Sequence, residues 1–161
     1  DADSRIEADG AYRPGDLEGA FLAGADDTPT VNAAIWREAE RERILLNAAD
    51  DRAHCHAIVP SLLRRGDLAI AVSTAGRSPA LAIRIRRELE ERYGPEYEEY
   101  VDLLGRLRDP VAVRLPDREA RRAFWHRLVD SDLLELVRAG DDEAIRARVE
   151  SELARIADRH A

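Results

Sequence analysis

Short apolar runs and longer amphipathic stretches alternate along the first half of the chain. Runs of strand length lie near Phe21 to Gly24, at Ile44 to Ala48 and at Leu68 to Ser73. Between the first two, apolar residues recur every three or four positions from about Thr30 to Arg43, which predicts a helix. Strands that alternate with helices form parallel sheets with right-handed crossovers. The pattern therefore predicts an α/β fold.

The middle of the chain is expected to be mostly helical. Helical periodicity covers residues 80–93 and 96–108, and Gly94-Pro95 and Asp109-Pro110 are expected to end these two helices. A short helical turn is also expected at 61–65. The last third adds three amphipathic helices that begin near Asp117, Ser131 and Asp141. Their apolar stripes need a partner surface.

Composition narrows the class of protein. The 161 residues are 45% hydrophobic and 36% charged, which is typical of a globular chain. The net charge of −8 argues against nucleic acid as a partner, and the apolar runs are too short to cross a bilayer. A single cysteine, Cys55, excludes an internal disulfide and fits the reducing cytoplasm. All 25 basic residues are arginine, which fits a GC-rich genome or a salt-adapted cytoplasm.

Two polar segments, each directly after a predicted strand and called corners below, contain the candidate functional residues. Asn47 and Asp50 follow the strand Ile44 to Ala48, and the turn Ser73-Thr-Ala-Gly-Arg-Ser78 follows the strand Leu68 to Ser73. Ser78 can cap the helix that starts at Pro79, and free amides at a helix start favour carboxylates or phosphates. Ligands of open α/β sheets lie at the carboxyl ends of the strands. We therefore expect the two corners to meet at one edge of a single sheet.

The segment His54-Cys55-His56 has the residue types of a metal site. Neighbouring side chains on an extended chain point to opposite sides, so at most the two histidines could share an ion. We expect Cys55 to pack in the core and predict no metal site. Asp51, beside Asp50, is expected to be solvated.

Several motifs in order resemble the siroheme-synthase N-terminal family. They are Ala23-Gly-Ala-Asp-Asp27, Val31-Asn32, Asn47-Ala-Ala-Asp50, Pro60, Arg65-Gly66 and Ser73-Thr-Ala-Gly-Arg-Ser-Pro79. The family comprises NAD-dependent precorrin-2 dehydrogenases, some of which are also sirohydrochlorin ferrochelatases. The resemblance implies oxidation of precorrin-2 to sirohydrochlorin, NAD as the cofactor and an interlocked homodimer.

The resemblance also implies roles for individual residues. Asp50 matches the catalytic aspartate, which takes a proton. The tetrapyrrole carries eight carboxylates, so hydroxyls, amides and arginines at the corners are expected to bind it. Substrate binding is assigned to Asn47, Thr74, Gly76, Arg77 and Ser78, and cofactor binding to Ala25 and Asp26. By charge alone, Arg84 and Arg86 are also candidate carboxylate partners, the alternative being that they are exposed surface residues.

The sequence departs from the family at its start. Members begin with a strand and a glycine-rich turn that holds the NAD pyrophosphate, and no Gly-x-Gly-x-x-Gly occurs in this sequence. We expect roughly forty to fifty residues of that βαβ portion to be missing. Ala25 replaces the threonine common in the family, and Ala75 replaces a glycine.

The expected organisation is a partial Rossmann-like parallel sheet followed by helices. Residues 1–78 would form a partial NAD-binding domain, 79–110 a helical dimerisation region and 111–161 a C-terminal helical region. One hypothesis is a precorrin-2 dehydrogenase, with or without ferrochelatase activity. The other is a non-catalytic remnant that binds tetrapyrroles or dimerises and does not use NAD.

Overall fold

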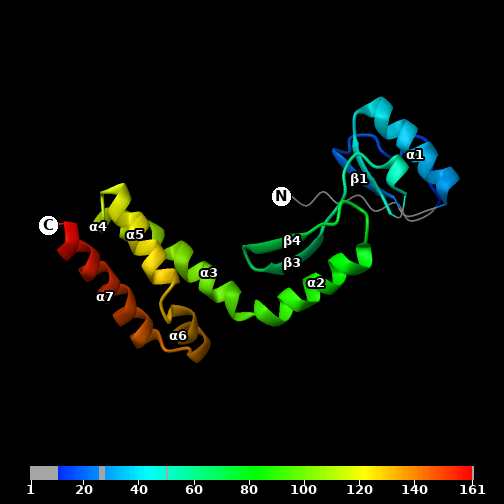
Figure 1. The fold of residues 1–161 in the computed structure, drawn as a ribbon. Coiled ribbons are helices and arrows are strands. Elements are labelled where there is room, and N and C mark those ends of the chain that lie inside the picture. The colour runs from blue at the N-terminus through cyan, green and yellow to red at the C-terminus, as the bar shows by residue number, and fades with distance from the viewer. Residues whose placement is uncertain (1–10, 26–27, 50, 161) are drawn as a thin grey trace. The chain divides into compact units, whose positions relative to one another are not determined.

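The structure is a computed structural model that describes residues 11–25, 28–49 and 51–160 (Figure 1). The chain divides into two compact units. The N-terminal unit contains the chain up to Ser61 together with Val72–Ile83. The helical unit contains Leu62–Ala71 together with Arg84–Ala161.

The N-terminal unit is built on a β-α-β motif. Strand β1 (Leu22–Ala25), helix α1 (Pro29–Glu42) and strand β2 (Leu45–Ala48) follow one another, and the two strands pair in parallel. Leu22 lies opposite Leu45 and Ala25 opposite Ala48. The predicted parallel α/β motif is therefore confirmed. Its core consists of small and aliphatic residues, namely Leu17, Ala25, Ile35, Ala39, Ile44, Leu46 and Ala48.

A buried carboxylate fastens the segment before β1 onto α1. Glu38 is only 4% exposed, and it accepts hydrogen bonds from the Tyr12 hydroxyl and from the amides of Gly15 (3.0 Å) and Leu17 (3.3 Å). The Tyr12 bond, followed by the amide bonds, holds the pKa of Glu38 below its ordinary value. Burial, then this bond, raises the pKa of Tyr12 to about 12. The ionised carboxylate is thus stabilised by neutral donors.

The third predicted strand lies in a different sheet from the one expected. Strand β4 (Leu68–Val72) pairs with strand β3 (Ser61–Arg65) in a separate two-stranded sheet. Two residues connect them, and Gly66 has φ +54°, a conformation that suits glycine in a tight hairpin turn. The helical turn predicted at 61–65 is therefore wrong, because this segment pairs with β4 and buries Leu63.

Two helices with short connections follow the hairpin. Helix α2 (Pro79–Arg92) and helix α3 (Glu96–Arg106) match the predicted positions on either side of Gly94-Pro95. The second helix ends at Arg106, close to the predicted end at residue 108, but Asp109-Pro110 does not end it, because these two residues lie inside the next helix, α4 (Arg108–Arg114). Pro110 lies in the first turn of α4, where its missing N–H has no helical partner to lose.

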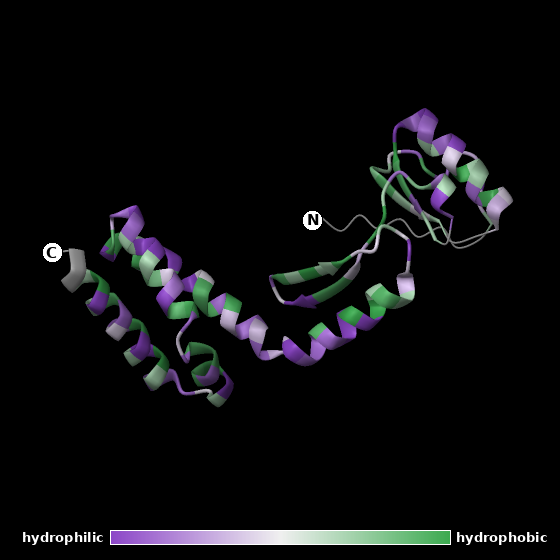
Figure 2. Cartoon of the chain, in the orientation of Figure 1, coloured by the Kyte–Doolittle hydropathy of each residue, from purple (hydrophilic) through white to green (hydrophobic). Residues whose placement is uncertain are grey.

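The last three helices are α5 (Arg118–Val129), α6 (Leu133–Ala139) and α7 (Asp142–His160). Their predicted starts are confirmed, since Asp117 accepts from the Ala120 amide and Asp141 from the Ala144 amide. Apolar and polar positions alternate along α7 (Figure 2). The apolar stripes of these helices pack with α3 and α4 into one core, whose buried members are Tyr100, Val111, Leu115, Ala120, Phe124, Leu128, Leu133, Val137, Ile145, Val149, Leu153 and Ile156.

One carboxylate is also buried in the helical unit. Glu152 on α7 is 2% exposed and accepts from Arg127 (2.8 Å) and Arg155 (3.0 Å), with Arg148 4.0 Å away. Three arginines therefore surround one negative charge. None of the helices in the described part of the chain has the length and apolar character that a membrane span requires.

Candidate functional site

The polar corner after β2 is held together by its own side chains. Asn47 is half-buried, and its Oδ1 accepts a hydrogen bond from the Val59 amide at 3.2 Å. This bond ties the chain around residue 59 to the end of β2 and leaves the Asn47 side-chain NH2 group as a donor. Asp50 and Asp26 lie outside the described residues.

Asp51 is paired and not solvated, contrary to the prediction. Its carboxylate lies 2.7 Å from Nδ1 of His54, and the Asp51 side chain is 16% exposed. The two residues frame the short 3-10 helix η1 (Arg52–His54), and the His54 amide also donates to the Asp51 carbonyl. The Asp51 carboxylate is therefore committed to a contact within its own turn.

The two histidines around Cys55 do not converge on a shared ion. His56 Nε2 lies 2.5 Å from a carboxylate oxygen of Glu40, and its Nδ1 accepts from the Leu46 amide. Trp36 contacts both rings, His54 edge-on at 5.7 Å and His56 stacked at 6.2 Å. As expected, Cys55 packs against the core of the unit. Its Sγ also forms hydrogen bonds with the backbone of Ala48. Within the described ranges, no group of three or more His, Cys, Asp or Glu residues is arranged to hold a metal ion.

The second corner is a tight turn before α2. The Arg77 amide donates to the Thr74 carbonyl at 3.0 Å, and the intervening Ala75 and Gly76 have φ +51° and +71°. Two successive positive φ values with this hydrogen bond define a type I′ turn. Gly76 suits this geometry, whereas Ala75 is strained by its methyl group.

Side chains of the turn cap its own backbone. Ser73 Oγ accepts from the Ala75 amide at 3.1 Å, and Thr74 Oγ1 accepts from the Ser78 amide at 3.0 Å. Ser78 Oγ accepts from the Leu81 amide at 3.4 Å, so the predicted helix cap is present but long. The Ala75 amide is therefore unavailable to a ligand. The Thr74 hydroxyl hydrogen and the Gly76 amide have no acceptor among the described residues and can serve a ligand.

The segment that follows the first corner contacts the second corner, although the strands before the two corners belong to different sheets. The stem of Arg52 lies across Gly76: a β-carbon on that glycine would come 3.0 Å from Arg52 Cδ and 3.3 Å from its Cγ. Both residues belong to the N-terminal unit. The expectation that the two corners share one edge of a single sheet is therefore wrong, and the contact with the second corner comes from Arg52 in η1.

The arginines selected from the sequence differ in their surroundings. Arg84 pairs with Glu88 at 3.0 Å and Arg86 pairs with Glu90, each one turn along α2. Arg77 is exposed and forms no ion pair among the described residues. Arg52 was not selected, because nothing in the sequence distinguishes it from the other 24 arginines.

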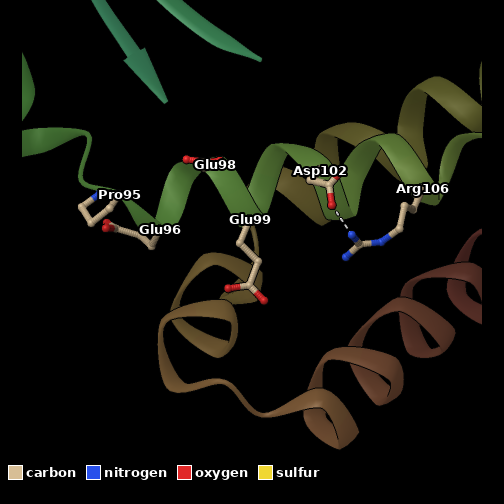
Figure 3. A pocket seen from close by; sticks show the side chains of 6 residues that line it. All are labelled: Pro95, Glu96, Glu98, Glu99, Asp102 and Arg106. Carbon is tan, nitrogen blue, oxygen red and sulfur yellow. Dashed lines mark hydrogen bonds and ion pairs between the residues drawn. The ribbon is translucent and has the colours of Figure 1, made fainter. Parts of the chain in front are cut away.

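A separate open hollow of about 650 Å³ lies along α3, away from both corners in sequence. Its lining is mostly acidic (Figure 3), consisting of Pro95, Glu96, Glu98, Glu99, Asp102 and Arg106. Its one arginine is paired with Asp102, and a hydrogen bond from Arg138 lowers the pKa of Glu96. This surface repels a polycarboxylate ligand.

Sequence comparisons divide the chain into three matched regions. Residues 1–61 match a region described as putative NAD(P)-binding, and 65–92 match the central region of a sirohaem biosynthesis protein. Residues 96–159 match the sirohaem synthase dimerisation region. An NAD(P)-binding match and a dimerisation region therefore occur in one chain.

Curated relatives are siroheme synthases from bacteria. That of Chromobacterium violaceum is 37% identical over 90% of this chain, and that of Photorhabdus laumondii is 32% identical over 89%. The chain spans 31% of the length of each of these relatives. Among solved structures, SirC, a precorrin-2 dehydrogenase, aligns with a TM-score of 0.55 and 24% identity over 92% of this chain and 69% of its own.

The structural match supports the α/β fold, and the sequence matches agree in order with the motifs from Ala23 to Pro79. Together they account for nearly the whole chain, so this protein belongs to the siroheme-synthase N-terminal family.

Proposed function

We propose that this protein acts in siroheme biosynthesis as a precorrin-2 dehydrogenase, which oxidises precorrin-2 to sirohydrochlorin with NAD. The observation that carries the proposal is the contact of Arg52 with Gly76, which brings the end of β2 to the turn before α2. This corner offers hydroxyl, amide and guanidinium donors, which suit a ligand with many carboxylates. The acidic hollow along α3 does not.

Within this proposal, the residues of the corner bind and orient the tetrapyrrole. Thr74 and Gly76 donate to one carboxylate, and the NH2 group of Asn47 donates to another. Arg77 is exposed and supplies a mobile positive charge. Ser78 orders the start of α2 through its cap. Asp50 takes the proton that the substrate loses, as a general base at the end of β2.

The described residues fit a dinucleotide poorly. The side chain of Ala25 is buried, and its carbonyl accepts from the Ala49 amide at 2.7 Å. No glycine-rich turn that could hold a pyrophosphate occurs in the sequence. NAD, when bound, accepts the hydride. Ala25 and Asp26 remain proposed cofactor contacts at the end of β1, and no step of the mechanism is derived through them.

Turnover tests the proposal directly. Purified protein is mixed with precorrin-2 and NAD, and NADH and sirohydrochlorin are measured together; NADP replaces NAD in a parallel sample. Equal amounts of both products would support the dehydrogenase. Tetrapyrrole binding without NADH formation would support the non-catalytic hypothesis, and absence of both would contradict the function. Adding Fe²⁺ and sirohydrochlorin in a separate sample measures iron insertion.

We also propose that the protein acts as a homodimer in the cytoplasm. A dimerisation region matches residues 96–159, and we infer that helices from Pro79 onward form the interface. Sedimentation at micromolar concentration should give about twice the 18.0 kDa mass of the chain. A monomer at that concentration would contradict the proposal.

A further inference from the structure

Arg52 is placed to act on whatever occupies the turn before α2. Its stem crosses Gly76 closely: a β-carbon added to that glycine would come 3.0 Å from Arg52 Cδ, so the arginine stem would have to shift by a few tenths of an ångström. The same added carbon would lie 3.3 Å from Arg52 Nε, so the guanidinium itself begins at the turn. Glycine at this position therefore lets the arginine stem lie against the turn without such a shift.

The charge of Arg52 is not neutralised by its surroundings in the described part of the chain. Its neighbour Asp51 is committed to His54 at 2.7 Å. Arg52 forms no ion pair or hydrogen bond with any described residue, whereas Arg84 and Arg86 are each paired along α2. A guanidinium has five N–H donors in a planar fork. Those of Arg52 remain open to an external acceptor.

Two more donors lie in the turn that Arg52 covers. The Thr74 oxygen accepts from the Ser78 amide, and its hydroxyl hydrogen has no acceptor among the described residues, so it is left to donate to a ligand. The Gly76 amide likewise has no acceptor among the described residues. A cation and two neutral donors at one place select an oxyanion, and a planar fork selects one with two equivalent oxygens.

We propose that Arg52 binds a carboxylate side chain of the tetrapyrrole, together with the Gly76 amide and the Thr74 hydroxyl. This inference rests on the proposed function and names the residue that would fix the substrate at the corner. A dinucleotide phosphate offers similar oxygens. The carboxylate is favoured because η1 follows β2 in the chain and Asn47 of β2 has a side-chain NH2 group as a further donor, and because the described residues fit a pyrophosphate poorly.

The test measures binding of sirohydrochlorin, NAD and NADP to the protein in separate titrations. Arg52→Gln should raise the dissociation constant for sirohydrochlorin about tenfold or more and leave those for the nucleotides unchanged. Arg52→Lys should fall between wild type and Arg52→Gln, because an ammonium cannot form the bidentate contact. Arg41→Gln is the matched control and should change none of the three constants, since Arg41 belongs to the same unit, is exposed and is paired with Glu42 at 2.8 Å.

The outcomes separate the two proposals. If wild type binds sirohydrochlorin and Arg52→Gln binds it equally well, the role of Arg52 is wrong while the proposed function stands. A selective loss of NAD or NADP binding would assign Arg52 to the nucleotide phosphate and overturn the carboxylate. If wild type binds no sirohydrochlorin, both proposals fail. Melting temperatures of the variants should match wild type, because the guanidinium has no described partner to lose.

Discussion

The two buried carboxylates in the described part of the chain, Glu38 and Glu152, are stabilised in opposite ways. Glu38 in the N-terminal unit is held by a phenol hydroxyl and two backbone amides, all neutral donors. Glu152 in the helical unit is surrounded by three arginines. The ionised carboxylate of Glu38 is therefore stabilised by a few well-placed hydrogen bonds from neutral groups, whereas that of Glu152 is stabilised by opposite charge.

The difference extends to the cores of the two units. The N-terminal core includes three alanines and lies beside polar ties such as Asn47 to Val59. The helical unit buries a larger, continuous set of apolar side chains centred on Phe124, Leu128 and Leu133. We infer that polar contacts position the N-terminal unit for binding and chemistry, and that apolar packing gives the helical unit its stability. Each unit contains one tryptophan, Trp36 or Trp125, which allows the units to be observed separately.

The largest expected effect is on the helical core. Phe124 is fully buried and packs edge-on to Trp125 at 5.1 Å. Phe124→Ala should lower the free energy of unfolding by about 3–5 kcal/mol, through lost burial and the cavity left behind. Denaturant unfolding followed through Trp125 in a Trp36→Phe background measures it. Val113→Ala is the control, because Val113 is 82% exposed and should matter little. Equal losses in both variants would contradict the apolar account.

The second effect concerns chemistry in the N-terminal unit. Asp50→Asn should lower precorrin-2 oxidation about 10²-fold, equivalent to about 2.7 kcal/mol in the barrier, because the general base is removed. Sirohydrochlorin binding should change much less. Asp51→Asn is the control: it weakens the contact with His54 and should lower stability more than turnover. Normal turnover of Asp50→Asn with a reduced melting temperature would make Asp50 a capping residue.

The third effect sharpens the contrast between the carboxylates. Glu38→Gln should cost about 1–3 kcal/mol at neutral pH, because an amide cannot accept all the donors that the carboxylate accepts. The pKa of Glu38 is lowered in the folded state from an ordinary 4.5. Its ionisation therefore contributes stability that is present above pH 4.5 and is lost as the pH falls through the folded pKa.

Urea unfolding of the N-terminal unit at pH 7 and at successively lower pH checks this linkage. The difference between wild type and Glu38→Gln should shrink as the medium becomes acidic. Glu152→Gln serves as the matched control and should leave the transition reported by Trp36 unchanged. If the difference in the free energy of unfolding between wild type and Glu38→Gln did not change with pH, the charge of the Glu38 carboxylate would not contribute to the stability of the N-terminal unit.

The smallest effect is at the turn before α2. Ala75 has φ +51°, and a β-carbon in this conformation costs about 1–2 kcal/mol. Glycine removes this strain, but its greater flexibility stabilises the unfolded chain and cancels part of the gain. Ala75→Gly should therefore stabilise the protein by about 0.5–1 kcal/mol. Thermal unfolding measures this gain. A lower melting temperature would mean that the Ala75 methyl group makes a contact worth more than the strain.

Local patterns predicted the elements well where the chain has its own signals. The Asp117 and Asp141 caps and the helical stripe of α1 are all local features. Residues 61–65 were misassigned because two leucines followed by two arginines fit a helical turn as well as a strand, and only pairing with β4 decides between them.

The candidate site was predicted in part. Sequence patterns identify the turn from Ser73 to Ser78 and the corner at Asn47, but the expectation of a common sheet edge is wrong, and the turn is contacted by Arg52. This contact depends on Arg52 lying over Gly76, a tertiary feature that neither the periodicity nor the spacing of residues in the sequence indicates. The pairing of Asp51 with His54 was missed for a similar reason, since an exposed turn and a carboxylate–imidazole pair have the same composition.

A crystal structure with bound sirohydrochlorin tests the central claim most directly. The account predicts a tetrapyrrole carboxylate within hydrogen-bonding distance of the Gly76 amide and the Arg52 guanidinium, with the macrocycle beside the end of β2. A tetrapyrrole bound along the acidic hollow of α3, or anywhere that leaves Arg52 and Gly76 free, would contradict it.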